Sequence, residues 1–153
     1  MTMSQNQIRT TTIADAEIIT EFNQLMAMET ENKKLPDDII ANGVKRLMQR
    51  PEYGFYLVAE NSNLKVVGTC MVTTEWSDWR DGLFWWIQSV YVKAEFRKQG
   101  IYTAMYKKIR ELADDEPDVC GFRLYVEKEN TIAQKTYESL GMQATDYLLY
   151  EST

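Results

Sequence analysis

The sequence contains no histidine, which removes the side chain most often used as a general base or as a metal ligand. Only two cysteines occur, Cys70 and Cys120, and their spacing matches no metal-binding motif. We therefore expect a protein without a metal cofactor. Both cysteines lie in apolar, strand-like runs, which favours buried, reduced thiols and a cytoplasmic location.

A surplus of basic residues and a long hydrophobic run are also missing. Seventeen basic residues stand against 23 acidic ones, a net charge of −6, which argues against general nucleic-acid binding and favours a cationic substrate. The longest strongly apolar run, Leu83 to Ile87, is far shorter than the roughly 20 residues that cross a bilayer. The first ten residues lack the apolar segment of a signal peptide. We expect neither nucleic acid nor membrane among the partners.

The 153 residues, 44% of them hydrophobic, predict one globular domain spanning 1–153. Periodicity predicts a definite order of elements. Strands are expected over 7–12, 54–60, 64–76, 83–92, 120–126 and 143–151, and helices over 13–28, 38–50, 101–112 and 131–140. The strand–helix–strand unit at 83–127 implies a right-handed crossover and a parallel pair. The predicted fold class is α/β, with a mixed, mostly antiparallel sheet of about six strands and helices on both faces.

The stretch FRKQGIYTAMYKKI, residues 96–109, places two cations and a glycine at the start of a predicted helix. A helix N-terminus offers unpaired N–H groups and a partial positive charge, and glycine lets an anion approach the backbone. A diphosphate would suit this loop, although an ordinary turn with two solvated cations explains the same residues. Neither G-x-G-x-x-G nor G-K-[ST] is present, so neither a dinucleotide-binding fold nor a P-loop is predicted.

A second motif, ENTIAQKTYESLGM at 129–142, follows one β-α-β unit later. Ala133 and Tyr137 share a helix face, and Tyr137 on its own is typical of a core aromatic residue. Taken with the loop, Val90–Tyr150 resembles the GNAT (GCN5-related N-acetyltransferase) superfamily. VYVKAEFRKQGIYTAMYKKI resembles its acyl-coenzyme A loop, Q/R-x-x-G-x-G/A, with Tyr102 in place of the last glycine or alanine. Residues 1–80 agree in element order only.

The resemblance implies an N-acetyltransferase with a GNAT-like fold. Acetyl-coenzyme A (acetyl-CoA) would lie between two splayed parallel strands, and a primary amine of a small molecule or peptide would attack its thioester directly. Tyr137 occupies the position of the acid that protonates the leaving thiolate. The residues implied in cofactor binding are Val90, Tyr91, Val92, Arg97, Lys98, Gln99, Gly100, Ile101, Tyr102, Thr103, Asn130, Ala133 and Tyr137.

The general base is not evident from the sequence. Members of the family carry a carboxylate at positions that here hold Gln88 and Tyr125, and neither side chain is a base. Glu75 and Glu127 remain candidates, with Glu75 expected on the same face of the sheet as Gln88. The interpretation of both glutamates as ordinary surface acids is the simpler one. We assign Glu75, Gln88 and Tyr125 to the substrate side of the site.

Two further questions stay open at this stage. All four tryptophans, Trp76, Trp79, Trp85 and Trp86, surround one predicted hairpin, where they could form a cation–π wall for the acceptor, pack the strands, or form a homodimer surface. Two functions compete with catalysis. One is an acyl-CoA-binding regulatory module with little turnover, and the other is a structural interaction domain that binds no coenzyme A.

Overall fold

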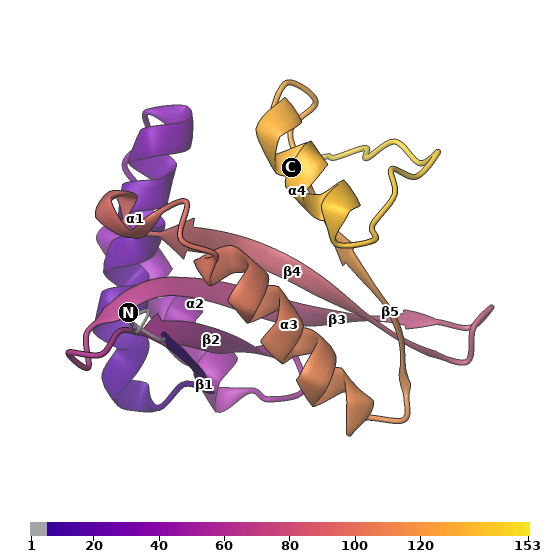
Figure 1. Ribbon diagram of the computed structural model, residues 1–153, viewed down its shortest axis with the longest axis horizontal. Helices are drawn as coiled ribbons and strands as arrows, with labels where there is room; N and C mark the ends of the chain where they lie inside the picture. Colours follow the sequence, from indigo (N-terminus) through magenta and orange to yellow (C-terminus); the bar gives the residue numbers. More distant parts are fainter. Residues whose placement is uncertain (1–5) are drawn as a thin grey trace.

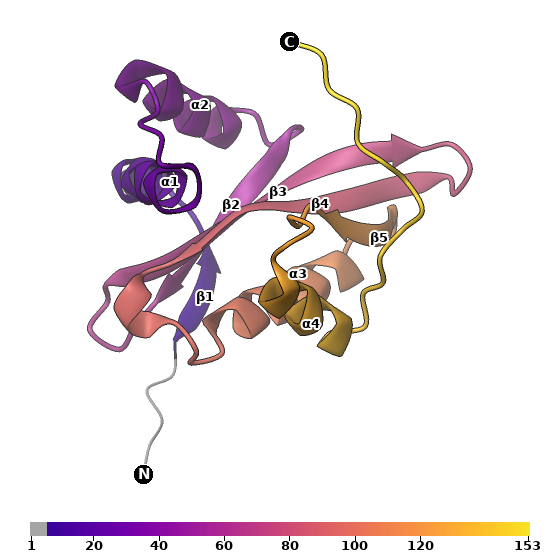
Figure 2. The same cartoon turned by 90° about the horizontal axis from the view of Figure 1, so that it is seen from above.

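A single five-stranded sheet forms the centre of the protein in the computed structural model, which describes residues 6–153. Helices α1 and α2 cover one face of this sheet, and α3 and α4 lie on the other (Figure 1, Figure 2). The strands are β1 (Gln7–Thr10), β2 (Gly54–Glu60), β3 (Val66–Ser77), β4 (Gly82–Val92) and β5 (Val119–Leu124). The helices are α1 (Ala16–Glu31), α2 (Asp37–Gln49), α3 (Ile101–Asp114) and α4 (Thr131–Ser139).

The strands follow one another across the sheet in chain order. Strands β1 to β4 are antiparallel neighbours, and β5 pairs with β4 in parallel after the α3 crossover. The predicted mixed, mostly antiparallel sheet with helices on both faces is confirmed. The parallel pairing begins at Leu83↔Val119 and ends at Ile87↔Leu124.

The sixth strand predicted over 143–151 is wrong, since this segment forms no strand in the structure. Its aromatic and apolar residues suit a strand, but none of its backbone groups bonds to another strand within the described residues. An extended segment without a partner gains no ladder hydrogen bonds. The segment instead leaves α4 as an extended coil that runs to a free end (Figure 2).

Two apolar layers hold the sheet between its helices. On the α3 face, Met105 and Ile109 pack against Leu57, Val72 and Ile87, as the spacing of apolar residues in the predicted helix requires. The opposite face is packed by a second cluster drawn from α1, α2 and β2, namely Ala16, Ile19, Val44, Tyr56 and Val58. The sheet is therefore packed from both sides at β2, whose residues contribute to both clusters.

Arg9 joins the first strand to the entrance of α1. Its guanidinium donates to both carboxylate oxygens of Asp15, at 2.9 and 3.0 Å, and to Glu60 on β2 at 2.9 Å. The carboxylate of Asp15 also accepts from the backbone N–H of Thr12 at 2.8 Å, which caps the turn before α1. The hydrogen bonds from Arg9 hold the pKa of Asp15 below its usual value.

We expect Arg9→Gln to lower the free energy of unfolding at pH 7 by about 1–3 kcal/mol, because Asp15 is left without its cation. The depressed pKa means that this stabilisation is present at neutral pH and is lost as the pH falls through the folded-state pKa of Asp15. The free energies of unfolding of the parent protein and of Arg9→Gln should therefore converge at acid pH. Urea unfolding across pH 2–7 measures the effect. Arg50→Gln, which removes an exposed pair with Glu52 at 3.8 Å, is the control and should change little.

Candidate functional site

Strands β4 and β5 part after Ile87 and Leu124, and the cause lies in β4. Gln88 pairs with Met71 and Tyr91 pairs with Thr69, so two residues of β4, Ser89 and Val90, oppose Cys70 alone. This is a β-bulge, which bends the strand that carries the extra residue. Ser89 accordingly adopts a left-handed conformation, with φ at 50°. The bulge turns β4 away from β5 and opens the sheet.

A cleft of about 550 Å³ lies at this opening. Helix α1 forms one wall, the bulged part of β4 and the chain after β5 form the sides, and Tyr137 of α4 closes the other end. Two of the lining side chains are acids, Glu31 and Glu127, and none is a lysine or arginine. The lining residues are Asn23, Met26, Ala27, Thr30, Glu31, Leu35, Ile87, Gln88, Ser89, Val90, Leu124, Tyr125, Val126, Glu127, Asn130 and Tyr137.

The cleft brings together residues that the sequence analysis assigned to one site. Gln88, Val90, Tyr125, Asn130 and Tyr137 all line it, although they come from separate elements. The contribution of α1 was not foreseen. Its one sequence signal is Asn23, a polar residue at an apolar position of the helix, where it is buried and donates to the carbonyl of Ile19 at 3.0 Å.

The loop that leads into α3, residues 97–103 around Gly100, is called the glycine loop. It presents a row of free backbone donors. Helix α3 begins at Ile101 with Gly100 as N-cap, and no side chain caps its first turn. Within residues 6–153, no protein acceptor bonds the N–H groups of residues 98–103. Lys98 and Gly100 are both left-handed, with φ at 63° and 80°. Such a run of N–H groups at a helix start suits an anionic ligand.

Arg97 is bound by the protein rather than directed into this loop. It donates to the carbonyl of Val92 at 2.7 Å and pairs with Glu29 of α1 at 2.7 Å. Its guanidinium also lies 5.3 Å from the ring centre of Tyr91, whose hydroxyl donates to Glu29 at 3.1 Å. The pair with Arg97 holds the pKa of Glu29 below its usual value. Arg97 therefore braces the loop against α1.

Tyr102 stands where the family's loop motif has glycine or alanine. Its side chain turns away from the free amides. Its ring packs on the core under α3 and lies edge-on to Tyr137, with ring centres 5.5 Å apart. Burial raises the pKa of Tyr102, and its hydroxyl is buried without a hydrogen-bond partner among residues 6–153. Because the side chain points inward, the loop keeps its backbone donors despite the missing glycine or alanine.

Tyr137 is placed by a helix with both ends specified. Asn130 caps the start of α4 by accepting from the N–H of Ala133 at 3.1 Å. At the other end, Gly141 is left-handed with φ at 91°, and the N–H of Met142 bonds to the carbonyl of Tyr137 at 3.1 Å. Burial raises the pKa of Tyr137, so its phenol stays protonated at neutral pH.

Of the two candidate bases, Glu75 and Glu127, only Glu127 lines the cleft. Glu75 lies opposite Phe84 as expected, but its carboxylate accepts from Arg123 at 2.6 Å and from the indole of Trp86 at 3.3 Å, and it does not line the cleft. Glu127 does line it. Of the two replaced carboxylate positions, Gln88 donates to Thr73 at 2.6 Å, whereas Tyr125 lies against Trp86 with ring centres 4.5 Å apart.

The tryptophans do not form a wall of the cleft, since none of the four lines it. Trp85 is buried in the core between Phe55 and Phe122. Trp76 and Trp79 are exposed at the tip of the β3–β4 hairpin. Strand packing therefore explains Trp85, and the hairpin tip remains a free apolar surface.

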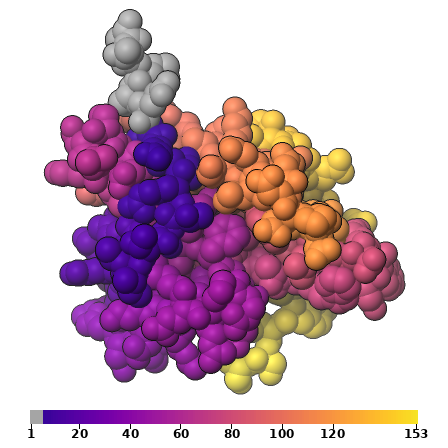
Figure 3. Space-filling model, turned by 90° about the horizontal axis from the view of Figure 1, so that it is seen from below, coloured from indigo at the N-terminus to yellow at the C-terminus, as the bar shows by residue number. Residues whose placement is uncertain are grey.

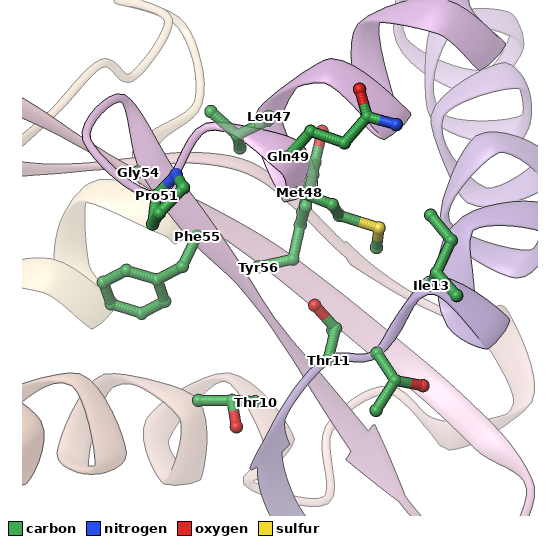
Figure 4. A pocket seen from close by; sticks show the side chains of 11 residues that line it. Thr10, Thr11, Ile13, Leu47, Met48, Gln49, Pro51, Gly54, Phe55 and Tyr56 are labelled. Atoms are coloured by element: carbon green, nitrogen blue, oxygen red, sulfur yellow. The ribbon is translucent and has the colours of Figure 1, made fainter.

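A second hollow, of about 350 Å³, lies between α2 and the start of β2 (Figure 4). Its lining consists of threonines, a glutamine and apolar residues, with no charged side chain. Tyr56 is its one titratable group, and burial raises the pKa of this phenol to about 12. Across residues 6–153, no cluster of three or more potential metal ligands occurs, and no helix has the length and apolarity that crossing a bilayer requires.

Comparison with known proteins identifies relatives of the whole chain. The model of the acetyltransferase (GNAT) family matches residues 17–142. A "possible acetyltransferase" from Clostridium difficile 630 is 44% identical, with 97% of each chain covered and a TM-score of 0.88. Among curated proteins, no match was found.

More distant structures share the fold. AAC(6')-Iy, solved with the bisubstrate analogue CoA-S-monomethyl-acetylneamine, is 16% identical over 98% of this chain and 99% of its own, with a TM-score of 0.78. Glucosamine-6-phosphate N-acetyltransferase from Arabidopsis thaliana is 19% identical over 97% and 98%, with a TM-score of 0.73. At these identities the likeness concerns architecture alone.

We expect Gly100→Ala to weaken coenzyme A binding by about tenfold, since an alanine in the left-handed region costs roughly 1–2 kcal/mol and shifts the loop. A methyl group there would meet no atom within 4 Å, so the backbone conformation is what requires glycine. Titration calorimetry measures the affinity. Gly43→Ala, in the middle of α2, is the matched control. It should raise stability by up to about 1 kcal/mol and leave the affinity unchanged. Equal affinities of Gly100→Ala and the parent for coenzyme A would show that the loop is not part of the binding site.

Proposed function

Because this chain belongs to the acetyltransferase (GNAT) family, we propose that it transfers an acetyl group from acetyl-CoA to a primary amine of a small molecule or peptide. One observation carries the proposal. Tyr137 and the bulged backbone of β4 line the same cleft, at the point where β4 and β5 part. A thioester laid in that opening would meet both a proton donor and main-chain hydrogen-bond donors.

Three segments would hold the coenzyme. The main chain of Val90, Tyr91 and Val92 extends beyond the last β4–β5 pair and would bond the pantetheine arm as an added strand does. The free N–H groups of residues 98–103 would bind the diphosphate, assisted by the charge of Lys98. Asn130 and Ala133, at the start of α4, would flank the arm from the other side. Arg97 would act through its bond to Glu29, by positioning the loop.

The chemistry follows from what lies in the cleft. The amine nitrogen attacks the thioester carbonyl, a C–N bond forms, and the negative charge that develops on oxygen is stabilised by a main-chain N–H of the β4 bulge. The C–S bond then breaks. Tyr137, kept protonated by its raised pKa, donates its proton to the departing sulfur, and the proton that the attacking nitrogen loses as the amide forms restores the phenol.

The acceptor side is acidic. Glu31 and Glu127 line the cleft without any basic side chain beside them, so the site attracts an ammonium group and disfavours an anion. The ammonium must lose a proton before it attacks. Glu31 and Glu127 are the two carboxylates in the cleft that can receive it, because Glu75 is engaged by Arg123 and Gln88 and Tyr125 cannot serve.

A binding module with little catalysis is the second candidate. Gln88 and Tyr125 favour it, because both stand where relatives in the family carry a carboxylate, and Gln88 is bonded to Thr73. Such a protein would bind acetyl-CoA through the same loop but would not turn it over.

Release of free thiol from acetyl-CoA distinguishes these functions. We expect release with a cationic amine in a panel of polyamines, aminoglycosides, amino acids and short peptides, and none with an amine that carries a net negative charge. A melting-temperature shift with acetyl-CoA, without thiol release for any amine, would identify the binding module. Absence of both would leave a structural domain and overturn the proposal.

We expect Tyr137→Phe to lower the rate of acetyl transfer by about 100-fold, within the range of a lost general acid. Binding of acetyl-CoA should be preserved, since the ring keeps its contact with Tyr102. Steady-state kinetics and calorimetry on the same preparation separate the two effects. Tyr53→Phe, at an exposed tyrosine before β2, is the control. A Tyr137→Phe protein as fast as the parent would exclude Tyr137 as the acid.

A further inference from the structure

One buried hydroxyl group serves neither the packing of the fold nor the reaction described so far. Among residues 6–153, Tyr102 carries the one buried side-chain polar atom that lacks a hydrogen-bond partner. Leaving a buried hydroxyl unpaired costs free energy, because its bonds to water are not replaced. The ring of Tyr102 packs against the core under α3, so only the oxygen is unsatisfied. An atom of this kind requires an explanation, and a catalytic role is one that native proteins provide.

Tyr137 is the functional side chain that lies against Tyr102. Their rings meet edge-on, with centres 5.5 Å apart, because α3 and α4 lie side by side (Figure 2). In the space-filling view the orange and yellow parts of the chain adjoin at the surface (Figure 3). Tyr102 lines neither the cleft nor the second hollow, so a ligand bound there does not reach its hydroxyl. A partner for this hydroxyl must therefore come from the protein.

Tyr137 is a weak acid for the step that the proposed function assigns to it. A phenol has a pKa of about 10 and a thiol a pKa of about 8.5, so the transfer of a proton from Tyr137 to a departing thiolate is unfavourable. Burial raises the pKa of Tyr137 and makes the transfer harder still. A hydrogen bond donated to the phenolate oxygen would stabilise the anion and ease the transfer.

We propose that Tyr102 is a positioning residue for Tyr137, and that its hydroxyl donates a hydrogen bond to the Tyr137 oxygen as that oxygen gives its proton to sulfur. This inference rests on the proposed function. In the step, the O–H bond of Tyr137 breaks, an S–H bond forms, and Tyr102 keeps its own proton. The proton that the attacking nitrogen loses then restores Tyr137.

The two side chains have the freedom and the hydrogen-bonding capacity that this step needs. Tyr137 is half-buried and lines the cleft, so its ring has room to turn toward Tyr102. A phenol oxygen can accept one hydrogen bond while it donates another, so Tyr137 can face the sulfur and Tyr102 together. The glycine or alanine of the family's loop motif carries no hydroxyl. The arrangement is therefore a property of this chain.

Tyr102 holds its proton more firmly than Tyr137 does, and so stays a donor. Burial raises the pKa of Tyr102, and the charge of an ionised Tyr137 raises it further. For Tyr137, burial is the one cause of the raised pKa. Tyr137 therefore ionises first. The other titratable groups around the pair are Tyr106 on α3, Cys70 on β3, and Glu31 and Glu127 in the lining of the cleft.

Titration of position 137 tests the hydrogen bond without any ligand. We expect 3-fluorotyrosine, incorporated at 137 alone in the full chain and followed by fluorine NMR, to titrate about one pH unit higher when Tyr102→Phe is added, because the phenolate loses its donor. Tyr106→Phe is the matched control. Tyr106 lies one turn further along α3, its hydroxyl accepts from Arg110 at 3.4 Å, and its loss should leave the midpoint unchanged. A midpoint that Tyr102→Phe leaves unchanged or lowers would overturn the proposal.

Thermal unfolding tests whether the hydroxyl is unpaired in the free protein. We expect Tyr102→Phe to raise the melting temperature by about 2–4 °C, since it removes an unsatisfied buried hydroxyl and keeps the ring. Tyr106→Phe removes a bonded hydroxyl and should not raise it. A lower melting temperature for Tyr102→Phe would mean that the hydroxyl already has a partner, and the proposal would then be wrong.

Single-turnover kinetics test the effect on the reaction. We expect Tyr102→Phe to slow acetyl transfer by about tenfold and to leave the affinity for acetyl-CoA unchanged, because the side chain does not line the cleft. A rate equal to that of the parent would contradict the proposal. A parent protein that releases no thiol from acetyl-CoA would end the proposed function instead. Normal thiol release with no change in the fluorotyrosine titration would end this inference alone.

Discussion

The parting of two hydrogen-bonded strands is the constraint on which the site depends. Strand β4 carries one residue too many opposite Cys70, and Ser89 takes up the excess in a left-handed conformation. Such a residue persists only where its surroundings hold it, at a cost of order 1–3 kcal/mol. Here the core supplies the restraint, since Val72 and Ile87, which pair with each other just before the bulge, are buried in it. The fold thus keeps an opening in its own sheet.

Local chemistry explains what the sequence predicted well. Strand β2 was expected at 54–60 and forms there, because it is rich in aromatic and β-branched residues. The start of α3 at Gly100 and the cap of α4 at Asn130 each follow from one residue and its immediate neighbours. The loop and Tyr137 were found for the same reason, since each lies in a short motif that can be recognised without its partners.

The features that could not be predicted from the sequence depend on contacts with residues far away in the chain. The bulge at Ser89 is defined only by its register against β3, and a serine carries no signature for it. Arg97 was assigned to the cofactor, but it pairs with Glu29, 68 residues away on a helix that no motif connected to the loop. The strand expected over 143–151 was wrong, because a strand needs hydrogen bonds to a neighbouring strand and this segment pairs with none within the described residues.

The bridge from Glu29 to Arg97 and Tyr91 ties helix α1, which lines the cleft, to the loop before α3. Helix α1 cannot move relative to that loop without breaking a 2.7 Å ion pair. If a ligand bound at the loop changes the affinity for a second ligand at α1, the second ligand changes the affinity for the first by the same factor, because thermodynamic linkage is reciprocal. If the proposed function holds, the two substrates would be energetically coupled before any bond between them forms.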